Sequence, residues 1–85
     1  MSEDKRRENE RRFTHWESLP TGGRRYFYEV LSRRGGWKAR YVKDVDAQEG
    51  TVLFVQEVFD ADGRLVERHQ KFPEDTGHQY IGDAQ

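Results

Sequence analysis

The fold is decided by residues 51–78, which read TVLFVQEVFDADGRLVERHQKFPEDTGH. The first nine positions are rich in Val and Phe, and strand-forming residues resume at Leu65 and Val66. The segment Asp60-Ala61-Asp62-Gly63 separates the two runs. Asp favours the start of a turn, and Gly tolerates the left-handed backbone that closes a short loop. The pattern predicts a β-hairpin, so we expect a mainly β protein.

The two faces of this hairpin differ in character. A type I turn that uses Gly63 as a bulge residue pairs Asp60 with Arg64 and places Val58 opposite Val66. Side chains alternate between faces along a strand. One face is then apolar and predicts the core, with Val52, Phe54, Val58, Val66 and Phe72. The other face is half apolar and half charged, with Leu53, Val55, Glu57, Phe59, Leu65, Glu67, His69 and Lys71.

The same pairing creates an electrostatic conflict, because it sets Glu57 opposite Glu67. Like charges directly across a strand pair are unfavourable. Either the register shifts by one residue, or a cation such as Arg40 lies between the two carboxylates. A shift by one residue would move every side chain of the second strand to the other face.

A second hairpin is expected over residues 24–34 and 37–45, joined by a two-residue turn at Gly35-Gly36. Arg34 opposite Trp37 places Tyr28 opposite Lys43. One face then carries the aromatic residues Tyr26, Tyr28, Trp37 and Tyr41. Short connections between the two hairpins predict a four-stranded antiparallel meander, curled or closed to a half-barrel. Residues 79–81 are expected to add a short edge strand.

The N-terminal segment differs from the rest of the chain. Residues 1–12 form a charged arm that we expect to be helical or disordered, because residues 2–12 hold no apolar side chain to dock a helix. Phe13, Trp16 and Leu19 recur at every third position, which suits a short helical turn packed on the sheet. Residues 13–82 then form a single small β domain, and residues 83–85 a frayed tail. A helical arm would make the fold α+β.

Composition narrows the class of protein. With 85 residues, 33% hydrophobic and 36% charged, the chain suits one small domain with part of its length outside the core. The chain has no Cys, which excludes disulfides and a Cys nucleophile. No secretory leader and no apolar run of the length of a membrane span is visible, so we expect a cytoplasmic protein without a membrane partner.

Charge is distributed unevenly along the chain. Residues 1–43 carry twelve Lys and Arg against six Asp and Glu, whereas residues 44–85 carry three against ten. Such asymmetry can indicate a charged partner. The favoured interpretation is intramolecular, with the two halves adjacent in the meander and neutralising one another.

A candidate catalytic group follows the central hairpin. His69, Lys71 and His78 lie within ten residues, and two imidazoles with a cation can cleave a phosphodiester without metal. This pattern predicts a small ribonuclease-like or toxin-like enzyme as one alternative. The competing and favoured interpretation is a hydrogen-bonded turn that Asp75 or Thr76 caps, in which Gly77 supplies a positive φ and the histidines fasten the ends. No metal site and no cofactor is expected.

The leading hypothesis for function is a protein-binding module that uses the half-apolar face. That face is too apolar for an idle solvent surface, and it would bind a partner protein or a second copy of the chain. The binding residues expected are Arg33, Lys38, Arg40, Leu53, Val55, Phe59 and Leu65. A further alternative is a binder of single-stranded nucleic acid through the basic N-terminal half, where aromatic residues alternate with Arg and Lys.

Overall fold

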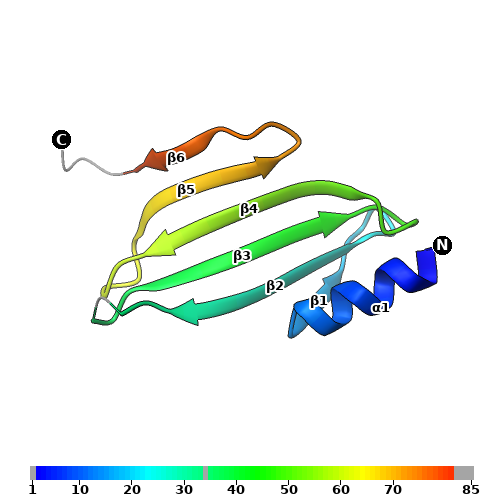
Figure 1. Ribbon diagram of the computed structural model, residues 1–85, viewed down its shortest axis with the longest axis horizontal. Helices are drawn as coiled ribbons and strands as arrows, with labels where there is room; N and C mark the ends of the chain where they lie inside the picture. Colours follow the sequence, from blue (N-terminus) through cyan, green and yellow to red (C-terminus); the bar gives the residue numbers. More distant parts are fainter. Residues whose placement is uncertain (1, 34, 82–85) are drawn as a thin grey trace.

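The computed structural model describes residues 2–33 and 35–81, which form one helix and six strands in a single antiparallel sheet (Figure 1). The elements are α1 (Ser2–Arg12), β1 (His15–Ser18), β2 (Arg24–Leu31), β3 (Lys38–Val45), β4 (Thr51–Phe59), β5 (Leu65–Phe72) and β6 (Gly77–Tyr80). Strand order in the sheet follows chain order, so the sheet is a meander with β1 and β6 at its open edges. The mainly β prediction is confirmed. The count of four strands is wrong, because two short edge strands extend the sheet to six.

Strand β1 occupies the segment that was expected to form a helical turn. Residues 15–18 instead pair with β2, with Trp16 opposite Tyr26. Pairing to the exposed edge of β2 satisfies a full row of backbone groups, which outweighs the weak local preference of a four-residue segment. At the other edge β6 pairs with β5, so the expected edge strand begins two residues earlier than predicted.

The pairing of β2 with β3 differs from the prediction by two residues. Tyr28 lies opposite Tyr41 rather than Lys43, and the strands end at Leu31 and Lys38. The connection is therefore longer than the predicted two-residue turn. Because the shift is an even number of residues, the predicted faces of both strands are preserved.

The pairing of β4 with β5 resolves the electrostatic conflict of the sequence. A β-bulge between Val58 and Phe59 shifts the register by one residue, so Glu57 lies opposite Arg68 and Val58 opposite Glu67. The assumed register holds beside the turn, where Phe59 lies opposite Leu65, but it is wrong beyond the bulge, where the expected alternative of a one-residue shift is confirmed. As a consequence, His69 lies on the face that carries Phe54 and Val58 instead of on the face of Leu53 and Val55.

The core lies where the start of β1 and the end of α1 meet one face of the sheet, which we call the helix face. Phe13, Tyr26 and Val45 are fully buried there, and partly buried Tyr28, Tyr41 and Phe54 pack against them. Docking of Phe13 on the sheet is confirmed. The opposite face, which carries Phe27, Val42, Leu53 and Val55, is called the open face, because α1 lies on the other side.

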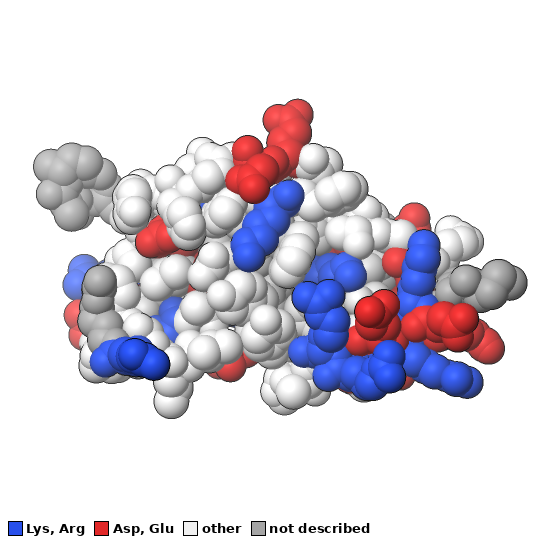
Figure 2. Space-filling view, in the orientation of Figure 1, with Lys and Arg blue, Asp and Glu red and all other residues white. Residues whose placement is uncertain are grey.

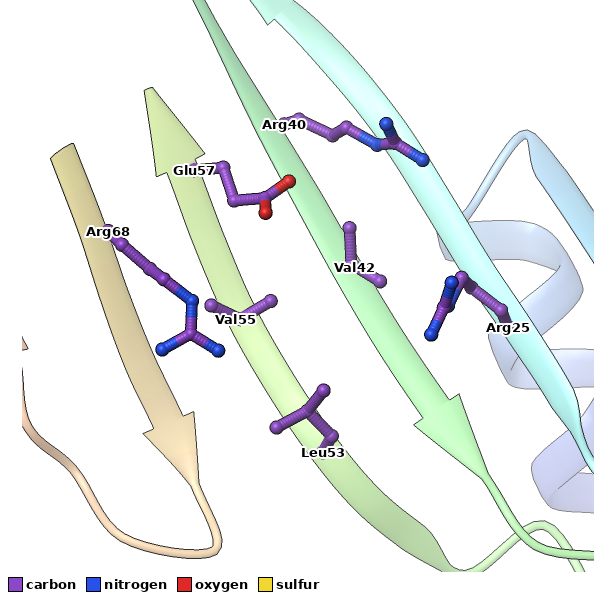
Figure 3. Close-up of a pocket in the computed structure, with 7 residues that line it drawn as sticks. All are labelled: Arg25, Arg40, Val42, Leu53, Val55, Glu57 and Arg68. Carbon is purple, nitrogen blue, oxygen red and sulfur yellow. The ribbon is translucent and has the colours of Figure 1, made fainter. Parts of the chain in front are cut away.

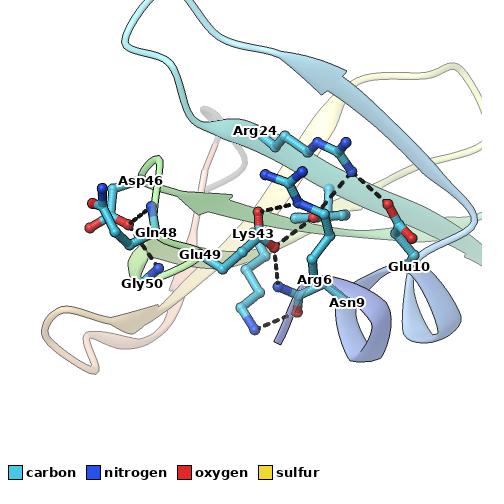
Figure 4. A network of polar contacts seen from close by, with 10 residues as sticks. Arg6, Asn9, Glu10, Arg24, Lys43, Asp46, Gln48, Glu49 and Gly50 are labelled. Atoms are coloured by element: carbon cyan, nitrogen blue, oxygen red, sulfur yellow. Dashed lines mark hydrogen bonds and ion pairs between the residues drawn. The ribbon is translucent and has the colours of Figure 1, made fainter. Parts of the chain in front are cut away.

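Helix α1 is held to the sheet by polar groups (Figure 4). The Glu49 carboxylate is buried and accepts hydrogen bonds from the Tyr26 hydroxyl at 2.7 Å and from Asn9 Nδ2 at 3.1 Å. It also pairs with Arg6 Nε at 3.4 Å, and the Lys43 ammonium donates to Asn9 Oδ1 at 2.8 Å. Burial raises the pKa of Glu49, but these hydrogen bonds outweigh it and hold the pKa below its usual value. Residues 2–12 of the arm are therefore a docked helix, although they contain no apolar side chain.

Charge gathers at the end of the molecule where α1 lies, whereas the middle of the surface in this view is mostly uncharged (Figure 2). Among residues 2–33 and 35–81, two ion pairs join the basic first half of the chain to the acidic second half. They link Arg6 with Glu49 and Arg25 with Asp44. Such pairs are what the intramolecular explanation of the charge asymmetry expects. No helix among the described residues is long and apolar enough to cross a membrane.

Candidate functional site

A concave hollow of about 220 Å³ lies in the middle of the open face (Figure 3). The residues that line it come from β2, β3, β4 and β5 and are Arg25, Arg40, Val42, Leu53, Val55, Glu57 and Arg68. The hollow is therefore built on adjacent paired strands rather than on loops. Side chains on paired strands are held in fixed relative positions, so the site is preorganised.

One row of side chains crosses the hollow with alternating charge. In the register of the sheet, Glu29 lies opposite Arg40, Arg40 opposite Glu57, and Glu57 opposite Arg68. Each charge thus has an opposite charge on the neighbouring strand, an arrangement that stabilises a sheet. The row explains why Glu57 is tolerated in the middle of an otherwise basic hollow.

The floor of the hollow is apolar and already shielded from water. Val42 and Val55 are only 7% and 3% exposed, although α1 lies on the other face. Long Arg side chains can lay their methylene stems along apolar surface while their charged ends stay in water. Arg25 and Arg68 reach toward these two valines from opposite sides of the hollow (Figure 3). The arginine stems thus act as a thin second layer over the sheet.

The three guanidinium groups differ in how many of their donors are used. Arg25 forms a fork with Asp44, at 2.8 Å from Nε and 3.0 Å from Nη2, and this hydrogen bonding raises the pKa of Arg25. Arg40 stacks on the Phe27 ring at 5.0 Å, and its Nε is buried without a hydrogen-bond partner. Among residues 2–33 and 35–81, no side chain forms an ion pair or hydrogen bond with Arg68. Arg68 therefore retains donors for a ligand, whereas Arg40 Nε is enclosed by the protein.

The residues expected to bind a partner are only partly brought together. Arg40, Leu53 and Val55 line the hollow. Lys38 borders it, paired with Glu29 at 3.4 Å, with its ammonium 5.9 Å from the Phe59 ring. The other three expected residues lie away from the hollow. Phe59 and Leu65 pair with each other at one end of β4 and β5, and Arg33 is exposed in the loop after β2.

Sequence reasoning missed the other lining residues, Arg25, Val42, Glu57 and Arg68. The conflict between Glu57 and Glu67 was the signal that could have found one of them. A shift by one residue brings Arg68 to the face of Glu57 and Val55 and removes His69 from it.

The predicted catalytic residues lie on the helix face. The His69 and His78 rings are in contact, with centroids 4.5 Å apart. His69 Nε2 lies 2.6 Å from Asp75 Oδ1, His78 Nδ1 bonds to Glu67, and His69 Nδ1 is buried without a partner. In this arrangement each ring is tied to a carboxylate, and rings in contact leave no space for a phosphate between them.

Two further groups belong to the same corner of the sheet. The Lys71 ammonium lies 5.4 Å from the Tyr41 ring and 5.5 Å from the Phe54 ring, so it is occupied by cation–π contacts. A hydrogen bond from the Gly77 N–H, together with His69, lowers the pKa of Asp75. These contacts resemble the hydrogen-bonded turn that competes with the catalytic interpretation, and the catalytic role of His69, Lys71 and His78 stays a prediction.

Three of the aromatic residues suggested for nucleic-acid stacking lie in the core or pack against it. Tyr26 is fully buried, and the Tyr28 and Tyr41 rings stack on each other at 4.9 Å on the helix face. Their π-faces are thus used within the protein. Comparison of this chain with protein-family models, curated proteins and solved structures found no match.

Proposed function

We propose that this protein is a small binding module that recognises a partner protein through its open face. The proposal is carried by one observation. The middle of the sheet holds a hollow that combines an apolar floor with the guanidinium group of Arg68, whose donors are unused among the described residues. Binding sites for small segments of a partner have this composition, with an apolar surface and a few fixed polar groups.

The position of the helix supports the choice of face. Helix α1 packs over Tyr26 and the other core residues of the helix face, whereas Leu53 and Phe59 on the open face remain only half-buried. Leu31, at the end of β2 on the open face, is 82% exposed. Apolar side chains that remain accessible on a rigid sheet favour contact with a partner.

The balance of charge favours a protein over a nucleic acid. The open face carries four cations, Arg25, Lys38, Arg40 and Arg68. It also carries four carboxylates, Glu17, Glu29, Asp44 and Glu57. Nucleic-acid affinity depends on a surplus of cations that displaces counterions from the phosphates. A face without net charge lacks this driving force, while alternating charges suit the polar rim of a protein interface.

Selection of ligands from a displayed library of random peptides tests the proposal. We expect peptides selected on the protein to lose at least about tenfold in affinity on a Leu53→Asn variant, because a polar amide replaces a lining side chain of similar volume. Val30→Asn is the matched control, since Val30 is 47% exposed on the other face. Circular dichroism and a thermal melt verify that both variants fold.

The same variants test self-association. Sedimentation equilibrium at millimolar concentration would show a dimer that Leu53→Asn dissociates if the partner were a second copy. Selected ligands that bind both variants equally, or a selection that enriches no peptide dependent on Leu53, would refute the open face as the binding surface.

A further inference from the structure

We propose that the hollow binds the carboxylate of an acidic side chain in an extended segment of the partner protein. Arg68 would hold the carboxylate, Arg40 on the opposite side of the hollow would add positive charge, and Val42, Leu53 and Val55 would pack against the apolar side chains two residues away on the same face of the segment. The inference rests on the proposed function, because it identifies the chemistry of the partner at the same surface.

The local charge of the hollow matches one negative charge. Three guanidinium groups line it, from Arg25, Arg40 and Arg68, whereas Glu57 is its one lining carboxylate. Asp44 is bound in the fork with Arg25 and neutralises that group. One positive charge is left over, and a carboxylate on a partner neutralises it without a surplus of the opposite sign.

The hydrogen-bond donors of the hollow that are unused within the protein match the geometry of a carboxylate as well as its charge. Arg68 forms no ion pair or hydrogen bond with a side chain among residues 2–33 and 35–81, so its donors are available. A carboxylate accepts two parallel N–H bonds from one guanidinium, and Arg68 can supply both. Arg68 reaches toward Val55 from the β5 side (Figure 3), so its donors lie beside the apolar floor.

Other occupants fit this hollow less well. A second copy docked hollow to hollow would bring a second surplus positive charge into the same contact, and like charges across an interface are unfavourable. Inorganic phosphate carries the negative charge but no apolar stem to cover Leu53. A nucleic acid would continue past the hollow over Glu17 and Glu29, which also lie on the open face.

The test uses the full chain and two capped hexapeptides that differ in one side chain. One has the sequence Val-Thr-Glu-Thr-Val-Thr, which in an extended chain places Glu and both Val side chains on one face, and the other has Gln in place of Glu. Titrations are followed by NMR through the arginine Nε–Hε signals and the Leu53 methyl signals. We expect the Glu peptide to shift the signals of Arg40, Arg68 and Leu53, and to bind at least about tenfold more tightly than the Gln peptide.

Two substitutions that should change the affinity for the Glu peptide in opposite directions extend the test. Arg68→Gln should weaken binding of the Glu peptide by about tenfold or more, because it removes a charged donor. Glu57→Gln should strengthen binding, because it removes the lining carboxylate that repels the ligand. Arg64→Gln is the matched control and should leave binding unchanged, since Arg64 is an exposed arginine in the turn between β4 and β5.

The outcomes separate this inference from the proposed function. Equal binding of both peptides at Leu53 would overturn the carboxylate inference and leave the open face as the binding surface. A Glu peptide that shifts signals of α1 alone, or that fails to bind at millimolar concentration while selected peptides bind at Leu53, would also overturn it. Tighter binding of inorganic phosphate or of a single-stranded oligonucleotide to Arg40 and Arg68 would replace the carboxylate by a phosphate ligand.

Discussion

Replacing Phe13 with Ala should remove the centre of the cluster that joins α1 to the sheet. The Phe13 ring is fully buried, and its centroid lies 5.8 Å from the Tyr26 ring and 5.3 Å from the Tyr28 ring. A third contact, at 6.3 Å, joins it edge-on to Phe54. Because three partners surround it, the space left by the ring cannot close without moving the strands.

The expected magnitude follows from burial and chain length. Truncation of a buried Phe to Ala costs about 3–5 kcal/mol. A domain of 85 residues has a free energy of unfolding of about 4–13 kcal/mol. The substitution should therefore remove about a quarter or more of the stability, and the thermal midpoint should fall by at least about 12 °C.

Urea denaturation followed by tryptophan fluorescence measures this loss. Trp16→Ala serves as the control, because Trp16 is 43% exposed although its ring lies 6.0 Å from Tyr26. We expect Trp16→Ala to cost less than half as much as Phe13→Ala. A cost below about 1 kcal/mol for Phe13→Ala, or one smaller than that of the control, would refute the position assigned to the core.

Two further predictions concern the buried carboxylate and a close backbone contact. The folded-state pKa of Glu49 is lowered, so its carboxylate stabilises the fold above the unfolded value of about 4.3 and loses this effect as pH falls through the folded value. Glu49→Gln should therefore reduce the loss of stability between neutral and strongly acidic pH in urea titrations, and an unchanged pH profile would contradict the role of Glu49. Gly23→Ala should lower the thermal midpoint sharply, because an added Cβ would lie 1.9 Å from the Val45 carbonyl oxygen. Gly35→Ala meets no atom within 4 Å, so equal effects of the two substitutions would contradict this contact.

The four long strands were predictable because their side chains alternate and their turns carry Gly or Asp. The two four-residue edge strands were not, since so short a segment acquires its structure from the neighbour it pairs with. The docking of α1 on the sheet could not be predicted from the sequence either. It depends on Asn9 and Glu49, two polar residues forty positions apart, whereas patterns of amphipathic helices reveal only apolar stripes.

The sequence predicted that the candidate site combines apolar and charged side chains on one face of the sheet, but it did not predict all the residues that form it. Alternation along β4 correctly grouped Leu53 with Val55, and both line the hollow. A bulge next to Val58 shifted the register of β5 against β4 by one residue. Arg68 therefore lies on this face and His69 does not. Bulges shift the register by a single residue, and no pattern in the turn sequence fixed the position of this one.

The strand order also has a consequence for how the chain folds. Every strand pairs with the strand before or after it in the sequence, so each pairing closes only a short loop. Short loops carry a small entropic cost of closure, and proteins dominated by such local pairings fold faster than sandwiches with distant pairings. The sheet can thus grow outward from a central hairpin, one strand at a time. Growth of this kind would complete β2 to β5, and with them the binding surface, before either edge strand is added.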